Sequence, residues 1–275
     1  MRFSKMHGIG NDFVVVDRRA QDQPISSELA RRLADRHVGV GCDQLLSIEN
    51  SVDPDCAFRY GIWNTDGSAA GQCGNGVRCV AAWLFRAGLI GRGSVRLQSP
   101  SGAVQCEVLD DHNVRVDMGA PVFEPAQVPF NAVSESDRYR LPLAQGEVDV
   151  GVVSIGNPHA VLRVEDVASA DVSGIGAQLE SHPYFPQRCN IGFMQVRARD
   201  HIQLRVFERG VGETLACGTG ACAAAVIGMR RGDLDSRVRV SLPGGELLIE
   251  WPDQNAAVWM TGPTQFVFEG DWHDD

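Results

Sequence analysis

The chain has 275 residues, of which 44% are hydrophobic and 22% charged, a composition typical of a globular protein with one large or two modest domains. Its formal net charge of −10 argues against nucleic acid or an anionic membrane surface as the partner. Residues 1–8 lack an apolar signal segment, and no window approaches the about 20 apolar residues of a membrane span, so we expect a cytoplasmic protein.

The first part of the chain predicts strands and a helix that lead to a cysteine. Residues 13–17 have the pattern of a buried strand that follows a turn rich in Gly and Asn. Ser26 begins a helical pattern that continues to His37 and stops before Gly39. Strands are expected at 43–48 and 57–64, and a loop of small residues at 65–72 then reaches Cys73.

A buried helix is predicted directly after Cys73. Apolar residues from Val77 to Phe85 recur at the spacing of one helix face, and Ala82 and Trp83 make the segment apolar nearly all round. The run ends at Gly88. Strands are expected after it at 95–97, 103–108 and 113–118.

The segment that starts at Cys73 has a second copy. Cys217-Gly218-Thr219-Gly220 repeats the pattern of Cys73-Gly74-Asn75-Gly76 at an offset of 144 positions. It also opens an apolar run that ends at Gly232, and strands are predicted after it at 238–242, 246–251 and 257–261. Polar residues recur with nearly the same offset: Asn11 with Asn157, Gln44 with Asn190, and Asn64 with Glu208. Ordered pairs of this kind indicate a duplicated unit.

The repeat predicts an α+β fold with two pseudo-symmetric halves. We expect each half to be a mixed or antiparallel sheet wrapped around a central apolar helix, with the active site in the cleft between the halves. The expected boundaries are 1–117, together with 263–275, for the first half and 118–262 for the second. Residues 122–145 are expected to form connection and edge structure.

The eight cysteines are too few for a disulfide scaffold in a chain of this length, so free thiols are expected. No Cys-x-x-Cys pair is present and histidines do not cluster near the cysteines, so we expect no metal site. Cysteines other than the repeated pair are predicted to pack as small hydrophobic residues, namely Cys42, Cys56, Cys79, Cys106, Cys189 and Cys222.

Two thiols at two helix N-termini favour one class of chemistry. A helix N-terminus lowers the pKa of a nearby thiol and binds carboxylate through free N–H groups. Two sulfurs on opposite sides of an amino acid could remove the α-proton from one face and return a proton to the other, which inverts the centre. Lys5 is the only lysine and has no Schiff-base context, so no pyridoxal phosphate or other cofactor is expected.

Along its whole length the chain resembles the diaminopimelate epimerase family. The resemblance is carried by KMHGIGNDF at 5–13, GCDQ at 41–44, NTDGSAAGQCGNGVRC at 64–79, GNPHAV at 156–161, RCNIGF at 188–193 and FERGVGETLACGTGACA at 207–223. Family members are cofactor-independent enzymes that interconvert LL- and meso-diaminopimelate for lysine and cell-wall precursor synthesis. The family's fold has two similar halves, in agreement with the repeat.

The resemblance assigns roles to particular residues. Cys73 and Cys217 are implied to be the acid/base pair, with Cys73 as donor and Cys217 as acceptor in one direction, and His159 and Glu208 are implied to tune the pKa values of the thiols. Substrate binding is implied for Asn11, Gln44, Asn64, Gly74, Asn75, Asn157, Asn190, Glu208, Arg209, Gly218 and Thr219. A homodimer is implied as well, with Phe268 in the closing segment 266–268 as a candidate contact.

Other interpretations stay open at this stage. A proline or hydroxyproline racemase would share two opposed cysteines, although several Asn residues and Arg209 exceed what a ring substrate needs. A non-catalytic thiol redox or binding module would also keep the cysteines. His159 could be a hydrogen-bonded loop histidine, and Asp12 and Asp43 are predicted to be turn or capping groups.

Overall fold

The computed structural model describes residues 1–21, 24–71 and 73–273, so Gln72, the last residue of the predicted loop 65–72, lies outside the described residues. The chain divides into two compact units. Unit 1 comprises Met1–Asp117 with Thr261–Asp275, and unit 2 comprises Met118–Met260. The chain therefore leaves unit 1 once and returns to it once.

Unit 1 is a set of strands around one long helix. Its helices are α1 (Ser27–Ala34) and α2 (Gly74–Arg86). Its strands are β1 (Arg2–Gly8), β2 (Asn11–Asp17), β3 (Gln44–Asn50), β4 (Phe58–Asn64), β5 (Gly93–Ser99), β6 (Gly102–Val108), β7 (Asn113–Asp117) and β17 (Gln265–Asp271).

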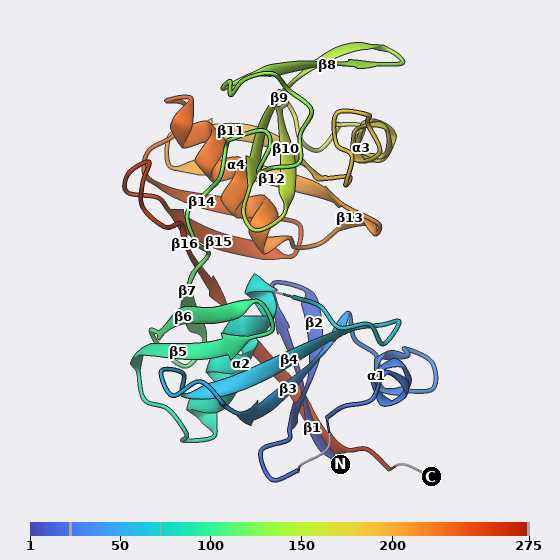
Figure 1. Ribbon diagram of the computed structural model, residues 1–275, viewed down its shortest axis with the longest axis vertical. Coiled ribbons are helices and arrows are strands. Elements are labelled where there is room, and N and C mark those ends of the chain that lie inside the picture. The colour runs from blue at the N-terminus through green and yellow to red at the C-terminus, as the bar shows by residue number, and fades with distance from the viewer. Residues whose placement is uncertain (22–23, 72, 274–275) are drawn as a thin grey trace. The chain divides into compact units, whose positions relative to one another are not determined.

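The strands of unit 1 pair in the order β17, β1, β2, β3, β4, β5, β6, β7. Pairing is antiparallel except between β2 and β3 and between β4 and β5, which are parallel. Parallel neighbours need a crossover connection, and α1 and α2 lie in these two crossovers. In Figure 1 the strands of unit 1 are seen around α2.

Unit 2 has the same construction. Its helices are α3 (Val172–Glu180) and α4 (Gly218–Arg230). Its strands are β8 (Tyr139–Leu143), β9 (Gly146–Ser154), β10 (Pro158–Arg163), β11 (Asn190–Ala198), β12 (His201–Glu208), β13 (Gly212–Thr214), β14 (Arg237–Leu242), β15 (Gly245–Glu250) and β16 (Trp259–Pro263), the last of which ends in unit 1.

The pairing in unit 2 repeats that of unit 1. The order is β8, β9, β10, β11, β12, β14, β15, with parallel pairs β10–β11 and β12–β14 and with α3 and α4 in the crossovers. The register agrees as well. Phe13 lies opposite Gln44 in β2 and β3, and the residues 146 positions later, His159 and Asn190, lie opposite each other in β10 and β11.

This topology confirms the predicted fold class of two similar halves, each a mixed sheet around an apolar helix. Both central helices are 13 residues long and start directly after a cysteine. They are almost entirely buried, as expected for segments that are apolar all round. The pattern that continued to His37 ends earlier, because α1 stops at Ala34 and Asp35 accepts the N–H groups of His37 and Val38.

Some elements were not anticipated. β1 carries two buried polar side chains, Ser4 and Lys5, and so lacks the apolar signature of a strand. α3 contains two glycines, which weaken the helical signal. Within 122–145, expected as connection and edge structure, residues 139–143 form β8, an edge strand that pairs with β9.

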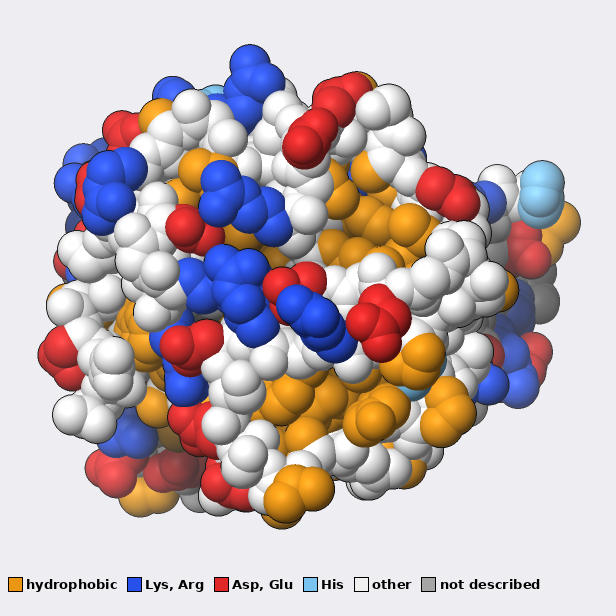
Figure 2. Space-filling model, turned by 90° about the horizontal axis from the view of Figure 1, so that it is seen from above, with side chains coloured by type: hydrophobic (Ala, Val, Ile, Leu, Met, Phe, Trp, Pro, Cys, Tyr) orange, Lys and Arg blue, Asp and Glu red, His pale blue; other side chains and the backbone are white. Residues whose placement is uncertain are grey.

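The face of the molecule in Figure 2 shows basic and acidic side chains next to one another rather than a field of one sign. No helix among the described residues is long and apolar enough to cross a bilayer.

Candidate active site

Cys73 forms the N-cap of α2. Its backbone is extended, with φ −147° and ψ 110°, and its Sγ accepts the N–H of Gly76 at 3.4 Å. A β-carbon added to Gly76 would lie 3.5 Å from this sulfur, an ordinary contact, and 3.3 Å from Cδ2 of Leu46, a tight one, so the first turn of α2 passes close to the thiol. Cys73 is partly exposed, whereas Gly74 and Asn75 behind it are buried.

The polar residues expected around Cys73 fall into two groups in unit 1. Asn11, at the start of β2, has its Oδ1 3.8 Å from the Cys73 sulfur and accepts a hydrogen bond from Nδ2 of Asn75 at 3.2 Å. Gln44 donates to Oδ1 of Asn64 at 3.0 Å across β3 and β4. The strand ends of the sheet thus bring Asn11 to the thiol, and they hold Gln44 and Asn64 as a pair.

Cys217 forms the N-cap of α4 in unit 2, with φ −128° and ψ 106°, and is buried. Its sulfur lies 3.7 Å from the hydroxyl of Thr219. The expected lowering of the thiol pKa does not hold for Cys217. Burial and then the carboxylate of Glu208 raise the pKa of this thiol well above its ordinary value, and the Thr219 hydroxyl and the Gly220 N–H offset only part of that shift.

His159 is fully buried in β10, and its Nε2 lies 2.9 Å from Oδ1 of Asn157. Burial, followed by the positive charge of Arg209, lowers the pKa of His159 to about 3. The imidazole is therefore neutral at neutral pH. Because an amide oxygen only accepts, Nε2 carries the proton and Nδ1 keeps a lone pair, for which no partner exists among the described residues.

The remaining expected residues of unit 2 surround the end of β12. Asn190 donates to the carbonyl of Pro158 at 3.2 Å and accepts the backbone N–H of Arg209 at 3.0 Å. The Arg209 side chain is exposed and donates to the carbonyl of Gln187 at 3.0 Å. Glu208 accepts a hydrogen bond from the hydroxyl of Thr214.

Two contacting residues were missed or underrated by sequence reasoning. Thr214, which donates to Glu208, lies inside the ERGVGETLACGTG motif, and only its place there could have drawn attention to it. Asp43, expected only as a turn group, accepts Nδ2 of Asn11 at 2.9 Å. The feature of the sequence that could have indicated this contact is the position of Asp43 directly before Gln44.

The other cysteines behave as predicted. All eight are free, and the six outside the two helix N-termini are buried. Burial is the leading cause that raises the pKa of Cys42 to about 11 and those of Cys79 and Cys106 to about 12. These thiols stay protonated at neutral pH and contribute packing rather than chemistry.

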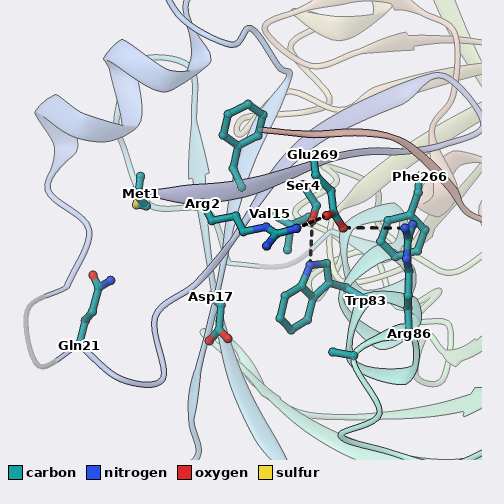
Figure 3. Close-up of a pocket in the computed structure, with 12 residues that line it drawn as sticks. Met1, Arg2, Ser4, Val15, Asp17, Gln21, Trp83, Arg86, Phe266 and Glu269 are labelled. Carbon is teal, nitrogen blue, oxygen red and sulfur yellow. Dashed lines mark hydrogen bonds and ion pairs between the residues drawn. The ribbon is translucent and has the colours of Figure 1, made fainter. Parts of the chain in front are cut away.

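Unit 1 also contains a cavity of about 440 Å³ away from its cysteine. Figure 3 shows it between β1, α2 and β17, with Glu269 between the guanidinium groups of Arg2 and Arg86 and with Trp83 donating to Ser4 at 3.0 Å. No cysteine is among the described residues that line it.

Comparison with solved structures defines the class of the fold. A hydroxyproline epimerase from Agrobacterium vitis, solved with bound trans-4-hydroxy-L-proline, matches with a TM-score of 0.70 at 14% identity, covering 98% of this chain and 91% of that one. A phenazine biosynthesis protein of the PhzF family from Bacillus anthracis matches with a TM-score of 0.70 at 15% identity, over 98% of each chain. At this identity the likeness shows the fold alone.

Sequence comparison is more specific. The family model for diaminopimelate epimerase matches residues 3–124 and 151–267. A diaminopimelate epimerase from Xanthomonas euvesicatoria pv. vesicatoria is 53% identical over 274 residues, covering 99% of this chain and 96% of the relative. One from Teredinibacter turnerae is 51% identical over 270 residues, with 98% of each chain covered. The chain therefore belongs to the diaminopimelate epimerase family.

Proposed function

We propose that this protein is a diaminopimelate epimerase that inverts one α-carbon without a cofactor and so interconverts LL- and meso-diaminopimelate. The observation that carries the proposal is the repeated placement of a cysteine at the N-cap of a buried 13-residue helix, once in each unit. The relatives at 51% and 53% identity, which bear this name, support the choice of substrate.

In the proposed mechanism the two thiols act on opposite faces of one carbon. One sulfur removes the α-proton as thiolate, and the other returns a proton as thiol, so the pair exchanges roles in the reverse direction. The α-carboxylate is bound by the N–H groups at the two helix N-termini, with Gly74, Asn75, Gly218 and Thr219 as the contributing residues. These N–H groups also stabilise the negative charge that develops as the proton leaves.

Cys217 needs a proton acceptor in the direction where it acts as the base, since burial and the charge of Glu208 favour its neutral thiol. We assign the role of proton acceptor to Glu208. Transfer of the thiol proton to this carboxylate would also remove the negative charge that opposes the thiolate. His159 is the second assigned tuning group. It is neutral, with a lone pair on Nδ1, so it would accept a hydrogen bond rather than act as a cation.

The distal end of the substrate carries a second carboxylate and a second ammonium group. We assign Arg209 to that carboxylate, because its exposed guanidinium offers a planar fork for bidentate binding. The remaining polar contacts are assigned to Asn11, Gln44, Asn64, Asn157, Asn190 and Glu208.

The test is hydrogen exchange at the α-carbon in heavy water. Diaminopimelate should exchange and invert in the presence of the protein, whereas proline should not. Exchange with proline alone would instead favour a racemase for a ring substrate. The hydroxyproline epimerase of the same fold makes proline the appropriate comparison substrate.

The cysteine variants separate catalysis from a binding role. Cys73→Ala and Cys217→Ala should each abolish inversion while the circular dichroism spectrum and melting temperature are retained. Cys79→Ala serves as the matched control, because this thiol lies in α2 and is fully buried. Retained inversion in either of the first two variants would contradict the two-base mechanism.

The proposal extends to a cytoplasmic homodimer. The absence of disulfides among the eight cysteines favours a reducing compartment. β17 pairs with β1 and exposes Val267 and Phe268 at 56% and 49%, which gives a second copy an apolar contact. Phe268→Asp should shift the mass measured by light scattering from dimer to monomer, and an unchanged mass would remove Phe268 from the interface.

A further inference from the structure

The amide of Asn11 is held in one orientation by its neighbours. Its Nδ2 donates to Oδ2 of Asp43 at 2.9 Å, and its Oδ1 accepts from Nδ2 of Asn75 at 3.2 Å. A flipped amide would bring its oxygen against the Asp43 carboxylate and its NH₂ against the NH₂ of Asn75. Asn75 could turn its own amide to accept, since its Oδ1 has no partner among the described residues, but a carboxylate cannot donate, so the contact with Asp43 fixes the orientation.

The orientation of the Asn11 amide decides which of its atoms faces the sulfur of Cys73. The atom of Asn11 that lies 3.8 Å from Sγ is the oxygen, which can accept from an S–H group and offers nothing to a thiolate. A flipped amide would present an N–H donor, which would favour the thiolate instead. The orientation of this amide therefore biases the cysteine toward the thiol, against the N–H of Gly76, which favours the thiolate.

Asp43 is itself anchored by a compact ionic network. Its carboxylate accepts from Arg36 at 2.7 Å and from the backbone N–H of Asp12 at 3.1 Å. In return, Asp12 accepts the backbone N–H of Asp43 at 2.9 Å and pairs with Arg36 and with Lys5. Lys5, the only lysine of the chain, also donates to the carbonyl of Gly41.

Two members of this network, Asp12 and Arg36, keep their charge over a wide pH range. Partial burial raises the pKa of Asp12, but hydrogen bonds from Arg36 and Lys5 outweigh it and lower that pKa to about 2. The pKa of Arg36 is raised, chiefly by its hydrogen bond to Asp12. Asp12 and Arg36 therefore stay charged between about pH 6 and pH 10.

We propose that Asp43 is a positioning residue, which fixes the Asn11 amide with its oxygen toward Cys73 and so favours the thiol form of this cysteine, the proton-donating form. The assignment of proton donor rests on the proposed function. The effect on the protonation of Cys73 does not, because it follows from hydrogen bonds within unit 1.

Other titratable groups near Cys73 do not provide this control. Burial raises the pKa of Cys79, in the same helix, to about 12, and it also raises that of Tyr60 in β4, so both stay neutral. Arg78 in α2 keeps its charge and lies 3.4 Å from the carbonyl of Gly74. His7 accepts the N–H of Gly10 through Nδ1, and the test is designed to cancel any contribution of this side chain.

The test measures the pH dependence of alkylation of the ligand-free protein by iodoacetamide. Cleavage after Arg59 and Arg78 yields a peptide in which Cys73 is the only cysteine, so mass spectrometry reports its reaction separately. In Asp43→Asn the pH midpoint for alkylation of Cys73 should move about half a pH unit lower. This shift corresponds to about threefold faster alkylation at a fixed pH below the midpoint. The midpoint for Cys217 should not move.

A double-mutant cycle separates amide orientation from the loss of one charge. In an Asn11→Leu background, Asp43→Asn should have no further effect, because no amide remains to be oriented, and any contribution of His7 is common to both backgrounds. Asp111→Asn removes the same charge from an exposed pair with Arg92 in unit 1 and should leave Cys73 unchanged. Melting curves verify that each variant is folded.

Two results would overturn the inference. One is a Cys73 midpoint that Asp43→Asn leaves unchanged, and the other is a shift of equal size with and without Asn11. Exchange of diaminopimelate by the wild-type protein is measured in parallel. Its absence would refute the proposed function and leave the alkylation result intact, so the two failures are distinguishable.

Discussion

The Nε2 atom of His159, at the start of β10, lies 2.9 Å from the Oδ1 atom of Asn157, which is two residues earlier in the sequence. This hydrogen bond sets the tautomer of a fully buried imidazole and leaves its Nδ1 as an acceptor. The corresponding position of unit 1, 146 residues earlier, is Phe13, which is also fully buried. The repeat therefore conserves burial at this site, whereas only unit 2 carries a titratable group there.

Burial of a neutral histidine makes stability depend on pH. The pKa of His159 is about 3 in the folded protein and about 6.5 in an unfolded chain, so the unfolded state binds more protons between these values. Stability should accordingly fall as pH decreases through this window. Between about pH 7 and pH 5 the loss should be about 2 kcal/mol.

Urea unfolding at the two pH values measures this loss. His159→Gln should reduce the difference in unfolding free energy by about that amount, since glutamine does not titrate. His112→Gln, at an exposed histidine, should leave the pH dependence as it is in the wild type. An unaltered pH dependence in His159→Gln would show that the buried imidazole is not its source.

The hydroxyl of Thr219 should set how readily Cys217 ionises. It lies 3.7 Å from the sulfur and lowers the pKa of a thiol that burial and Glu208 raise. Thr219→Val keeps the shape and removes the hydroxyl, so the pH at which Cys217 reacts with iodoacetamide should rise, with about threefold to tenfold slower reaction at a fixed lower pH. Thr219→Ser should react as the wild type does. Equal rates for Val and Ser would exclude the hydroxyl as the cause.

Particular elements show how much of the fold could be predicted from the sequence. α2 and α4 were predictable, because each combines a Cys-Gly start, an apolar 3.6-residue period and a terminal glycine. β1 was not predictable. It pairs with β17 at the other end of the chain, and Ser4 and Lys5 are buried in the folded protein although both are polar. Such long-range pairing leaves no local periodicity to detect.

The same distinction holds for the candidate sites. Motif resemblance named Asn11, Cys73 and Asn75, and the structure brings these three together within unit 1. It could not indicate that Asp43 orients Asn11, because that contact depends on the parallel pairing of β2 with β3. Nor could it indicate that Cys217 has a raised pKa, because burial and the approach of Glu208 are properties of the folded chain.

Arg230, at the C-terminal end of α4, should anchor the segment that precedes β8. Its guanidinium bonds Glu135 at 2.7 Å and Asp137 at 2.6 Å and lies 4.0 Å from the ring centre of Phe123. Because the side chain is only 20% exposed, Arg230→Ala should lower the unfolding free energy by about 1–3 kcal/mol. Arg199→Ala, at an ion pair whose side chains are 63% and 53% exposed, should cost less than about 1 kcal/mol. Equal losses of unfolding free energy in the two variants would show that Arg230 does not anchor this segment.

Gly176 should resist the substitution that usually strengthens a helix. It lies within α3, where alanine in place of glycine would ordinarily stabilise by about 1 kcal/mol. At this position an added β-carbon would lie 2.7–2.8 Å from Cβ, Cγ and Cδ2 of Phe207, atoms close to the backbone of β12 that cannot swing away. Gly176→Ala should therefore destabilise the protein by about 1–3 kcal/mol.

The matched substitution is Gly91→Ala, where a β-carbon would meet nothing within 4 Å and the backbone does not have a positive φ. It should be neutral or slightly stabilising, by up to about 1 kcal/mol, because it restricts the unfolded chain. Urea unfolding of the two variants beside the wild type measures both effects. If Gly176→Ala were as stable as Gly91→Ala, the close packing of α3 on β12 would not limit the size of residue 176.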